Sequence, residues 1–362
     1  MNILFDIGHP AHVHLYRYAI SKLKANGHKV IVTVKEIPSA IDLLNKYEIP
    51  YVSLGKKFDH ILLKGLTQLK YNFNLYHIVR REKIDIAIGS SITITHVSRI
   101  TRMCSIVLDD DDANAVVLFS KLAHPFAHSI LSPAALKHDR LRIKDVTYKG
   151  THELFYLHPN YFSPDPHVLE ELGINQSDKF FVLRFVAVKA YHDLGQMGLT
   201  TAQKLQIVET LKPFGRVLIT TEREIEPELA EYALKISPEQ IHHLLYYATL
   251  YVGDSQTMTS EAAILGTPAL KCNSFAHKLS VPNMLETQYN LCYAFQPDEF
   301  EQMIQKMKDL LANPDLKKSW EIKRRQFLDE SIDPTEFLTW FIEKWPNSAN
   351  VLKENGDYAN RF

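Results

Sequence analysis

The chain has 362 residues, 46% of them hydrophobic and 23% charged, which is typical of a globular protein too long for one compact core. Its 41 Lys and Arg residues nearly balance 42 Asp and Glu residues, and the net charge of −1 argues against nucleic acid as a partner. Three cysteines without metal-ligand spacing, no signal-peptide pattern and no apolar run of about 20 residues predict a cytoplasmic protein.

In the first half of the chain, short apolar runs alternate with amphipathic stretches. Helices are predicted at 13–25 and 39–47. Strands that alternate with helices predict a parallel sheet covered on both faces. The predicted strands are 3–6, 29–34, 51–54, 84–88 and 105–108.

A stretch with three prolines, 156–166, interrupts the pattern and is predicted to be a linker. Ser237 and Pro238 predict the start of a helix before residue 250, and Asp333 predicts the start of a last helix, 334–345, with a fraying polar tail. The alternation resumes between these points, with strands predicted at 180–185, 216–220, 250–252 and 269–271.

One architecture therefore occurs twice, and the predicted fold class is α/β with two domains. Residues 1–158 form the predicted N-terminal domain and 159–178 the linker. Residues 179–333 form the predicted C-terminal domain, which leaves 334–362 as a final helix and tail.

Ligands bind open parallel sheets at the carboxyl ends of the strands, so the residues after each strand are candidates. After the first strand, Gly8 permits a turn, and His9, His12 and His14 open a helix. A histidine here could take the proton of an acceptor hydroxyl, and His12 and His9 are favoured over His14. The alternatives are packing or solvent exposure, and a zinc site is less favoured because no further ligand cluster is evident.

Four carboxylates, Asp109 to Asp112, follow the strand at 105–108. Asp109 and Asp110 are candidates for a catalytic carboxylate or for magnesium binding. The alternative is a solvated helix start, at which Asp111 and Asp112 cap the helix.

Arg184 ends an apolar strand in the second half. A buried arginine needs a partner, which a phosphate or a structural ion pair would supply. Lys189 and His192 follow on a loop expected to face the same ligand.

A later strand ends at a glycine turn, where Asp254 precedes a helix that begins with Ser255, Gln256 and Thr257. The unpaired amides of a helix start suit a diphosphate, and the hydroxyl groups add donors. Glu261 lies inside this helix among small and apolar residues, and two ribose hydroxyls would pair its carboxylate. The alternative is a capped helix whose glutamate pairs with a nearby lysine.

These residues carry a family resemblance. Asp254-Ser255, Glu261-Ala262 and the Leu-Gly-Thr-Pro run at 265–268 resemble the donor-binding signature of GT-B glycosyltransferases and UDP-N-acetylglucosamine 2-epimerases. The stretches 6–14 and 150–159, which contain Asp6…His9-Pro10-Ala11-His12 and His152-Glu153, resemble more narrowly the family known as domain of unknown function 354.

The resemblance implies a GT-B fold: two Rossmann-like domains facing across a cleft, with the last helix crossing back to the first domain. It implies a nucleotide diphosphate sugar, often a UDP-sugar, held by the second domain, with no cofactor and no catalytic metal. In that scheme Glu261 binds the ribose, Ser255 the diphosphate, and Arg184 assists at the phosphates. The epimerases carry glycines where this chain has Gln256-Thr257, and their N-terminal Gly-Thr-Arg-Pro-Glu motif is missing, which favours transfer over epimerisation.

Residues 56–81 combine an apolar helical stripe with flanking lysines and arginines. Such a helix could lie on an anionic membrane and reach a lipid-linked acceptor, whereas packing on the protein's own sheet is the alternative. The stripe consists of Leu62, Leu66, Leu69, Phe73 and Tyr76.

The sequence thus predicts an enzyme that moves a sugar from a nucleotide diphosphate sugar to a hydroxyl of a glycan or lipid-linked acceptor, in surface polysaccharide assembly. His12 or His9, or less favourably Asp109, is the predicted base. The alternatives are a UDP-sugar epimerase or hydrolase, which needs no acceptor, and a non-catalytic nucleotide-sugar binding protein.

Overall fold

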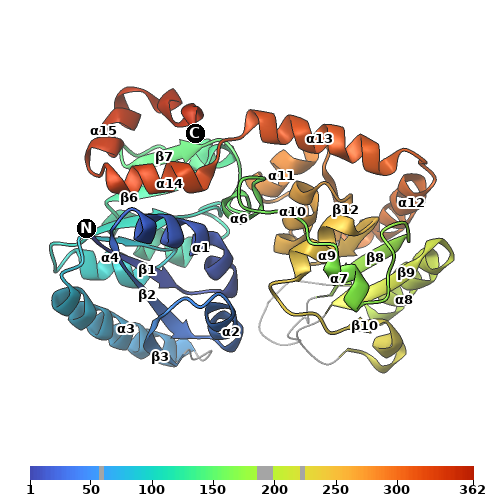
Figure 1. The fold of residues 1–362 in the computed structure, drawn as a ribbon, viewed down its shortest axis with the longest axis horizontal. Coiled ribbons are helices and arrows are strands. Elements are labelled where there is room, and N and C mark those ends of the chain that lie inside the picture. The colour runs from blue at the N-terminus through green and yellow to red at the C-terminus, as the bar shows by residue number, and fades with distance from the viewer. Residues whose placement is uncertain (57–60, 186–198, 221–224) are drawn as a thin grey trace. The chain divides into compact units, whose positions relative to one another are not determined.

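The computed structural model is a mixed α/β protein with two parallel sheets. The chain divides into two compact units, of which the first consists of Met1–Tyr161 with Glu330–Phe362 and the second of Phe162–Asp329. Figure 1 shows the elements of each unit. The structure describes residues 1–56, 61–185, 199–220 and 225–362, with only the backbone of 61–64.

The sheet of the first unit has seven parallel strands in the order β3-β2-β1-β4-β5-β6-β7. Its central strand positions contain β-branched and other apolar residues that are buried on both faces, as a helix-covered parallel sheet requires. The strands are β1 (Asn2–Ile7), β2 (Lys29–Glu36), β3 (Val52–Lys56), β4 (Ile86–Ile88), β5 (Cys104–Leu108), β6 (Ser129–Pro133) and β7 (Asp145–Tyr148).

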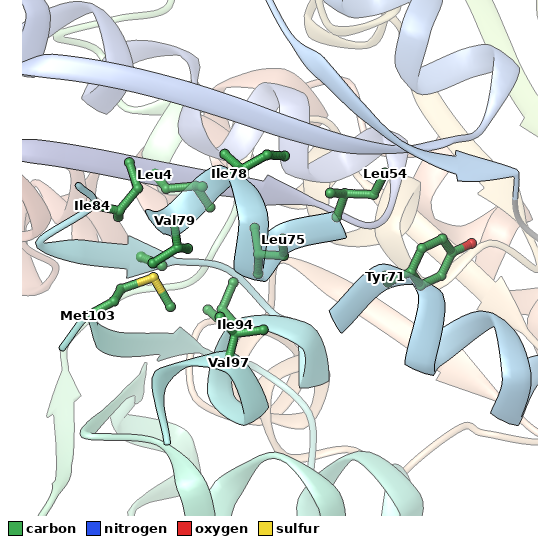
Figure 2. Close-up of a cluster of buried hydrophobic side chains, with 11 residues drawn as sticks. Leu4, Leu54, Tyr71, Leu75, Ile78, Val79, Ile84, Ile94, Val97 and Met103 are labelled. Atoms are coloured by element: carbon green, nitrogen blue, oxygen red, sulfur yellow. The ribbon is translucent and has the colours of Figure 1, made fainter. Parts of the chain in front are cut away.

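Helices cover both faces of this sheet. One face carries a core in which Leu75, Ile78 and Val79 pack against Leu4 of the sheet and Ile94 of a second helix (Figure 2). The helices are α1 (Pro10–Ala25), α2 (Pro38–Lys46), α3 (Ile61–Glu82), α4 (Ile92–Ser98), α5 (Val117–Leu122), α6 (Leu154–Leu157), α14 (Pro334–Glu343) and α15 (Asn347–Glu354), with 3-10 turns η1 (His124–Phe126), η2 (Ala134–Asp139) and η6 (Gly356–Arg361).

The sheet of the second unit has six parallel strands in the order β10-β9-β8-β11-β12-β13. They are β8 (Phe180–Arg184), β9 (Arg216–Thr220), β10 (Ala233–Leu234), β11 (Leu250–Gly253), β12 (Ala269–Cys272) and β13 (Cys292–Phe295). The helices are α7 (His167–Glu171), α8 (Thr201–Leu211), α9 (Ile241–Tyr247), α10 (Gln256–Leu265), α11 (Ser280–Thr287), α12 (Phe300–Leu311) and α13 (Leu316–Glu330), with 3-10 turns η3 (Lys212–Phe214), η4 (Pro227–Tyr232) and η5 (Pro297–Glu299).

The two sheets share a strand order. In each unit the third strand along the chain, β3 or β10, forms one edge of the sheet, and the first strand, β1 or β8, lies in the middle. The predicted repeat of one α/β architecture is therefore confirmed. The prediction omitted four strands. Two of them, β6 and β7, contain polar residues, whereas β13 is an apolar run of only four residues and β10 has only two residues.

Two local predictions were wrong. The helix before β11 begins at Ile241, and its N-cap is Gln240 instead of Ser237. Ser237 lies in the preceding turn, where its backbone carbonyl accepts the amide of Gln240. The tail beyond Trp345 does not fray. It forms α15 and η6, and the ring of Phe362 packs against that of Trp340 with 5.1 Å between the ring centroids.

The helix predicted after Asp333 is α14, which packs against α1 in the first unit. Asp333 caps it as predicted by accepting the amides of Thr335 and Glu336. The Glu336 side chain pairs with Lys22 of α1, which ties the end of the chain to its beginning. The range 159–178, expected as a linker, contains α7, whose Val168 and Leu169 are buried. Among the described residues no helix is both long and apolar enough to cross a bilayer.

Candidate functional site

The histidines after β1 take three different roles. His9 is exposed and caps α1, because its Nδ1 accepts the amide of Ala11 at 3.2 Å. His14 is buried, with its Nδ1 3.1 Å from the hydroxyl of Tyr47. These contacts favour structural roles for His9 and His14, and His12 remains as the functional candidate of the three.

His12 lies over the turn at Gly8, whose amide donates to its Nδ1 at 3.3 Å. Burial, followed by the nearby positive charges of His9 and His152, lowers the pKa of His12 from 6.5 to about 3. A neutral ring that accepts at Nδ1 carries its proton on Nε2. His12 is therefore arranged as a hydrogen-bond donor rather than as a base.

Asp109, at the end of β5, is the centre of a buried ion cluster. Its Oδ2 lies 2.7 Å from Nε2 of His124 and accepts Nη2 of Arg140 at 2.8 Å. The same Nη2 donates to the carbonyl of Asp111 at 2.9 Å, so Arg140 fixes the loop that follows the strand. These contacts favour a structural role for Asp109.

Asp110 lies in the same loop, and its side chain contacts His152, which follows β7. Its Oδ1 lies 3.2 Å from Nδ1 of His152, which is buried after β7. Burial alone would lower the pKa of His152, but the charge of Asp110 and their hydrogen bond outweigh it and raise that pKa. The same contact outweighs burial at Asp110 and holds the pKa of its carboxyl below the usual range.

Several buried polar atoms around this pair have no hydrogen-bond partner among the described residues. They include Nε2 of His152, the hydroxyl of Tyr148, Oγ1 of Thr151 and Oδ2 of Asp6. Buried polar groups without partners are costly, and a group of them at the carboxyl ends of β1 and β7 indicates a position for a polar ligand.

Two groups of acidic and histidine side chains could hold a metal ion, because their ligand atoms lie within 4.8 Å of one another. The first group is Asp109, Asp110 and Asp111, and the second is Asp112, His138 and Asp139. In the first group the carboxylate of Asp109 already contacts His124 and Arg140, so a metal ion would compete with both side chains. Asp111 and Asp112 do not cap a helix as expected, because α5 begins later, after Val116.

In the second unit, β11 runs into α10 through a close turn. A Cβ on Gly253 would lie 2.2 Å from the carbonyl of Arg184, so only glycine fits beside the end of β8. Ser255 is the N-cap of α10, and its hydroxyl accepts the amide of Met258 at 3.4 Å. Arg184, Asp254, Ser255 and the start of α10 are therefore neighbours, which is the arrangement expected for an anion site.

Glu261 is buried within α10, and its Oε1 lies 3.0 Å from Nε2 of the buried His242 in α9. The neighbour is thus a histidine rather than the lysine of the alternative interpretation. The hydroxyl of the buried Tyr251 lies near the charges of Asp254, Arg184 and Glu261.

Lys271 is a buried cation that the sequence analysis missed. Its amine donates to Oε1 of Gln256 at the first turn of α10. Burial lowers the pKa of Lys271, as expected for an ammonium group removed from water. The exposed Thr257 is next to Gln256. Lys189 and His192 lie outside the described residues.

Of the predicted candidates, the first unit brings together His12 and Asp110, and the second brings together Arg184, Asp254, Ser255, Gln256 and Glu261. His152 is not among the predicted site residues, although it lies in the His152-Glu153 stretch that carries the narrower family resemblance. The local sequence gives no signal for His124 and Arg140, which contact Asp109, or for His242, which contacts Glu261. The fold alone brings these side chains together.

The model of a family described as "Protein of unknown function (DUF354)" matches residues 1–319. The chain belongs to this family. An uncharacterized protein of Methanocaldococcus jannaschii is 23% identical over 286 residues, which are 75% of this chain and 82% of that protein.

Solved structures show the same fold at low identity, which confirms the predicted GT-B class. The UDP-GlcNAc 2-epimerase from Neisseria meningitidis bound to UDP-GlcNAc is 13% identical, with a TM-score of 0.65 over 98% of this chain and 99% of the epimerase. A putative UDP-N-acetylglucosamine 2-epimerase from Listeria monocytogenes is 13% identical, with a TM-score of 0.66 over 97% and 94%. Spinosyn forosaminyltransferase is 14% identical, with a TM-score of 0.62 over 95% and 98%.

Proposed function

We propose that this protein is an enzyme that uses a nucleotide diphosphate sugar and transfers its sugar to an acceptor hydroxyl. The observation that carries the proposal is the pair of Asp110 and His152. Asp110 faces Nδ1, so this nitrogen carries the proton, and the lone pair of Nε2 is left without a partner among the described residues. A carboxylate that orients an imidazole in this way makes a general base.

In this proposal the base is His152 rather than His12. A pKa of about 3 makes the imidazole of His12 a poor proton acceptor, and its Nδ1 already accepts the amide of Gly8. His152 has a raised pKa and therefore binds a proton more readily. His12 would instead donate a hydrogen bond from Nε2 to the bound acceptor.

The nucleotide would bind at the start of α10. Its first amides, with Arg184, would hold the diphosphate, and the carboxylate of Glu261 would accept hydrogen bonds from the ribose. Lys271 would add a positive charge behind Gln256. Amides and cations of this kind stabilise a departing diphosphate, so the transfer would need no metal.

Epimerisation at C2 of a UDP-sugar is the second candidate. It is supported by the fold shared with UDP-GlcNAc 2-epimerases and by Asp111, which offers a second proton carrier near Asp110. Asp111 is exposed at the surface, but partial loss of hydration and the charges of Asp110 and Asp109 raise its pKa to about 7. An epimerase moves a carbon-bound proton twice and needs such a group, whereas a transferase does not.

Incubation with UDP-GlcNAc and related nucleotide sugars in heavy water separates these reactions. Transfer predicts release of nucleoside diphosphate only when an acceptor is added, without deuterium in the unreacted donor. Epimerisation predicts deuterium at C2 without an acceptor. His152→Gln should abolish turnover, while His12→Gln should keep a measurable rate. Turnover of His152→Gln at the wild-type rate would contradict the assignment of the base.

A further inference from the structure

The exposed side of α3 is unusually apolar for a surface helix. Leu66, Leu69 and Phe73 are 67%, 65% and 63% exposed, so three large side chains on one face of the helix point into solvent. The inward face is supplied by other residues, among them Tyr71 and Leu75, which are buried in the core of Figure 2. The expected alternative, in which the whole stripe packs on its own sheet, does not apply to these three residues.

A second exposed apolar group lies on α5 and η1. Leu118 is 71% exposed, and Val117, Leu122 and Phe126 are also exposed. These residues are distant from α3 in sequence, but α4 joins the two segments in space.

The junction is made by His96 of α4. Its Nδ1 lies 3.4 Å from the side-chain nitrogen of Asn72 on α3, and its Nε2 lies 3.0 Å from the carbonyl of Leu122 on α5. The ring of His96 also contacts the ring of Phe126 edge-on at 5.3 Å. Asn72 is on the side of α3 that contacts α4, and Phe73 is the next residue. The exposed residues of α3 therefore lie beside the side of the helix that contacts α4. We call Leu66, Leu69, Phe73, Leu118 and Leu122 the α3–α5 patch.

Basic residues predominate in the segments that carry this patch, although Glu82 ends α3 and pairs with Arg81. The stretches 61–81, 92–103 and 113–126 contain no aspartate or glutamate, although the whole chain has 42. The same stretches contain seven basic residues, which are Lys64, Lys70, Arg80, Arg81, Arg99, Arg102 and Lys121. In a chain of net charge −1, this asymmetry marks a surface complementary to an anionic partner.

We propose that the α3–α5 patch docks on a lipid surface that carries anionic headgroups. Leucine and phenylalanine side chains on the outer faces of helices can enter the acyl boundary, while flanking lysines and arginines bind the headgroups. Four of the five patch residues are leucines, which have no ring to stack on a base, so a single-stranded nucleic acid fits this surface less well.

The docking itself does not depend on the proposed reaction. If both hold, the acceptor is lipid-linked, and membrane binding would bring the first unit to it. Loss of vesicle binding and loss of turnover are measured separately, so either idea can fail alone.

The test is co-sedimentation of the full chain with phosphatidylcholine vesicles that contain or lack phosphatidylglycerol. We expect binding to the anionic vesicles that weakens as salt is raised. Lys70→Gln and Lys121→Gln should each weaken binding about fivefold, the value expected for one basic residue near such a surface. Leu69→Ser with Phe73→Ser should weaken it more.

Matched controls lie on exposed positions of the second unit. Ile322→Ser removes a side chain that is 65% exposed, and Lys318→Gln removes an exposed lysine. Both should bind vesicles as the wild type does, and all variants should keep the wild-type circular dichroism spectrum. Wild-type protein that stays in the supernatant with anionic vesicles, or patch variants that bind as tightly as the controls, would overturn the proposal.

Discussion

Oδ1 of Asp110 lies 3.2 Å from Nδ1 of His152, although the two residues follow different strands, β5 and β7. The contact fixes the ring and turns Nε2 away from the carboxylate. Because the carboxyl ends of parallel strands meet at one edge, the fold places an oriented imidazole where the ligands of such sheets bind. This relationship supports the proposed role of His152 as the base.

Asp110→Asn should change the pH dependence of turnover in a definite direction. Burial lowers the pKa of His152 and Asp110 is the main group that raises it, ahead of Glu153 and Asp109, so loss of the Asp110 charge should lower that pKa. A base works when unprotonated, and the acidic limb of the kcat/KM profile should therefore move to lower pH. The plateau should fall roughly a hundredfold or more, because the imidazolium loses its carboxylate. An unmoved acidic limb would show that this pair does not control the rate.

Asp111→Asn should stabilise the protein, but only where the wild-type carboxyl is charged. Partial loss of hydration and the neighbouring carboxylates raise the pKa of Asp111 from 3.8 to about 7 in the folded state. A raised pKa means that the folded state binds this proton more tightly, so its contribution to stability is lost as the pH rises toward 7.

The urea midpoint of Asp111→Asn should therefore exceed that of the wild type at about pH 8 and approach it at about pH 4. Asp329→Asn, at an exposed position of α13, is the control and should show no such difference between the two conditions. An equal gain at both pH values would indicate a cause other than titration.

Arg140→Leu should lower the free energy of unfolding by about 3 kcal/mol, because breaking a buried pair leaves a charge without its partner. The guanidinium donates to Asp109, to the carbonyl of Asp111 and to Ser132 at 2.8 to 2.9 Å. Urea unfolding measures the change, with the exposed Arg325→Leu as the control. A loss equal to that of the control would mean that His124 alone stabilises Asp109.

Removal of divalent ions should leave turnover unchanged. His124 and Arg140 occupy Oδ2 of Asp109, and in the proposed scheme Arg184 and the start of α10 neutralise the diphosphate. The measurement compares initial rates before and after treatment with EDTA. A rate that falls with EDTA and returns with added Mg²⁺ or Mn²⁺ would require an ion at one of the acidic groups.

The α/β fold class followed from local patterns, because apolar runs alternate with helical periodicity. The C-terminal tail did not, since α15 and η6 are held by contacts with distant residues, such as Phe362 against Trp340. Helix packing there overrides a polar local sequence.

The site shows the same division. The anion-binding start of α10 could be predicted because a helix start, a glycine turn and Ser255 are local features. The pairing of Asp110 with His152 joins residues 42 positions apart and depends on β7, a strand that the sequence patterns did not predict. Polar residues between its apolar ones weakened the signal of β7, and its contribution to the site was missed with it.

The most direct test of the account is calorimetric titration with a panel of nucleoside diphosphates and the matching nucleosides. We predict that UDP or another nucleoside diphosphate binds, and that Glu261→Gln weakens both this ligand and its nucleoside about tenfold, since a hydrogen bond to a charged group is lost. Arg184→Gln should weaken the diphosphate far more than the nucleoside, and Glu231→Gln, an exposed change in the same unit, should weaken neither. Binding of no nucleoside diphosphate, or unchanged affinity in Glu261→Gln, would contradict the account.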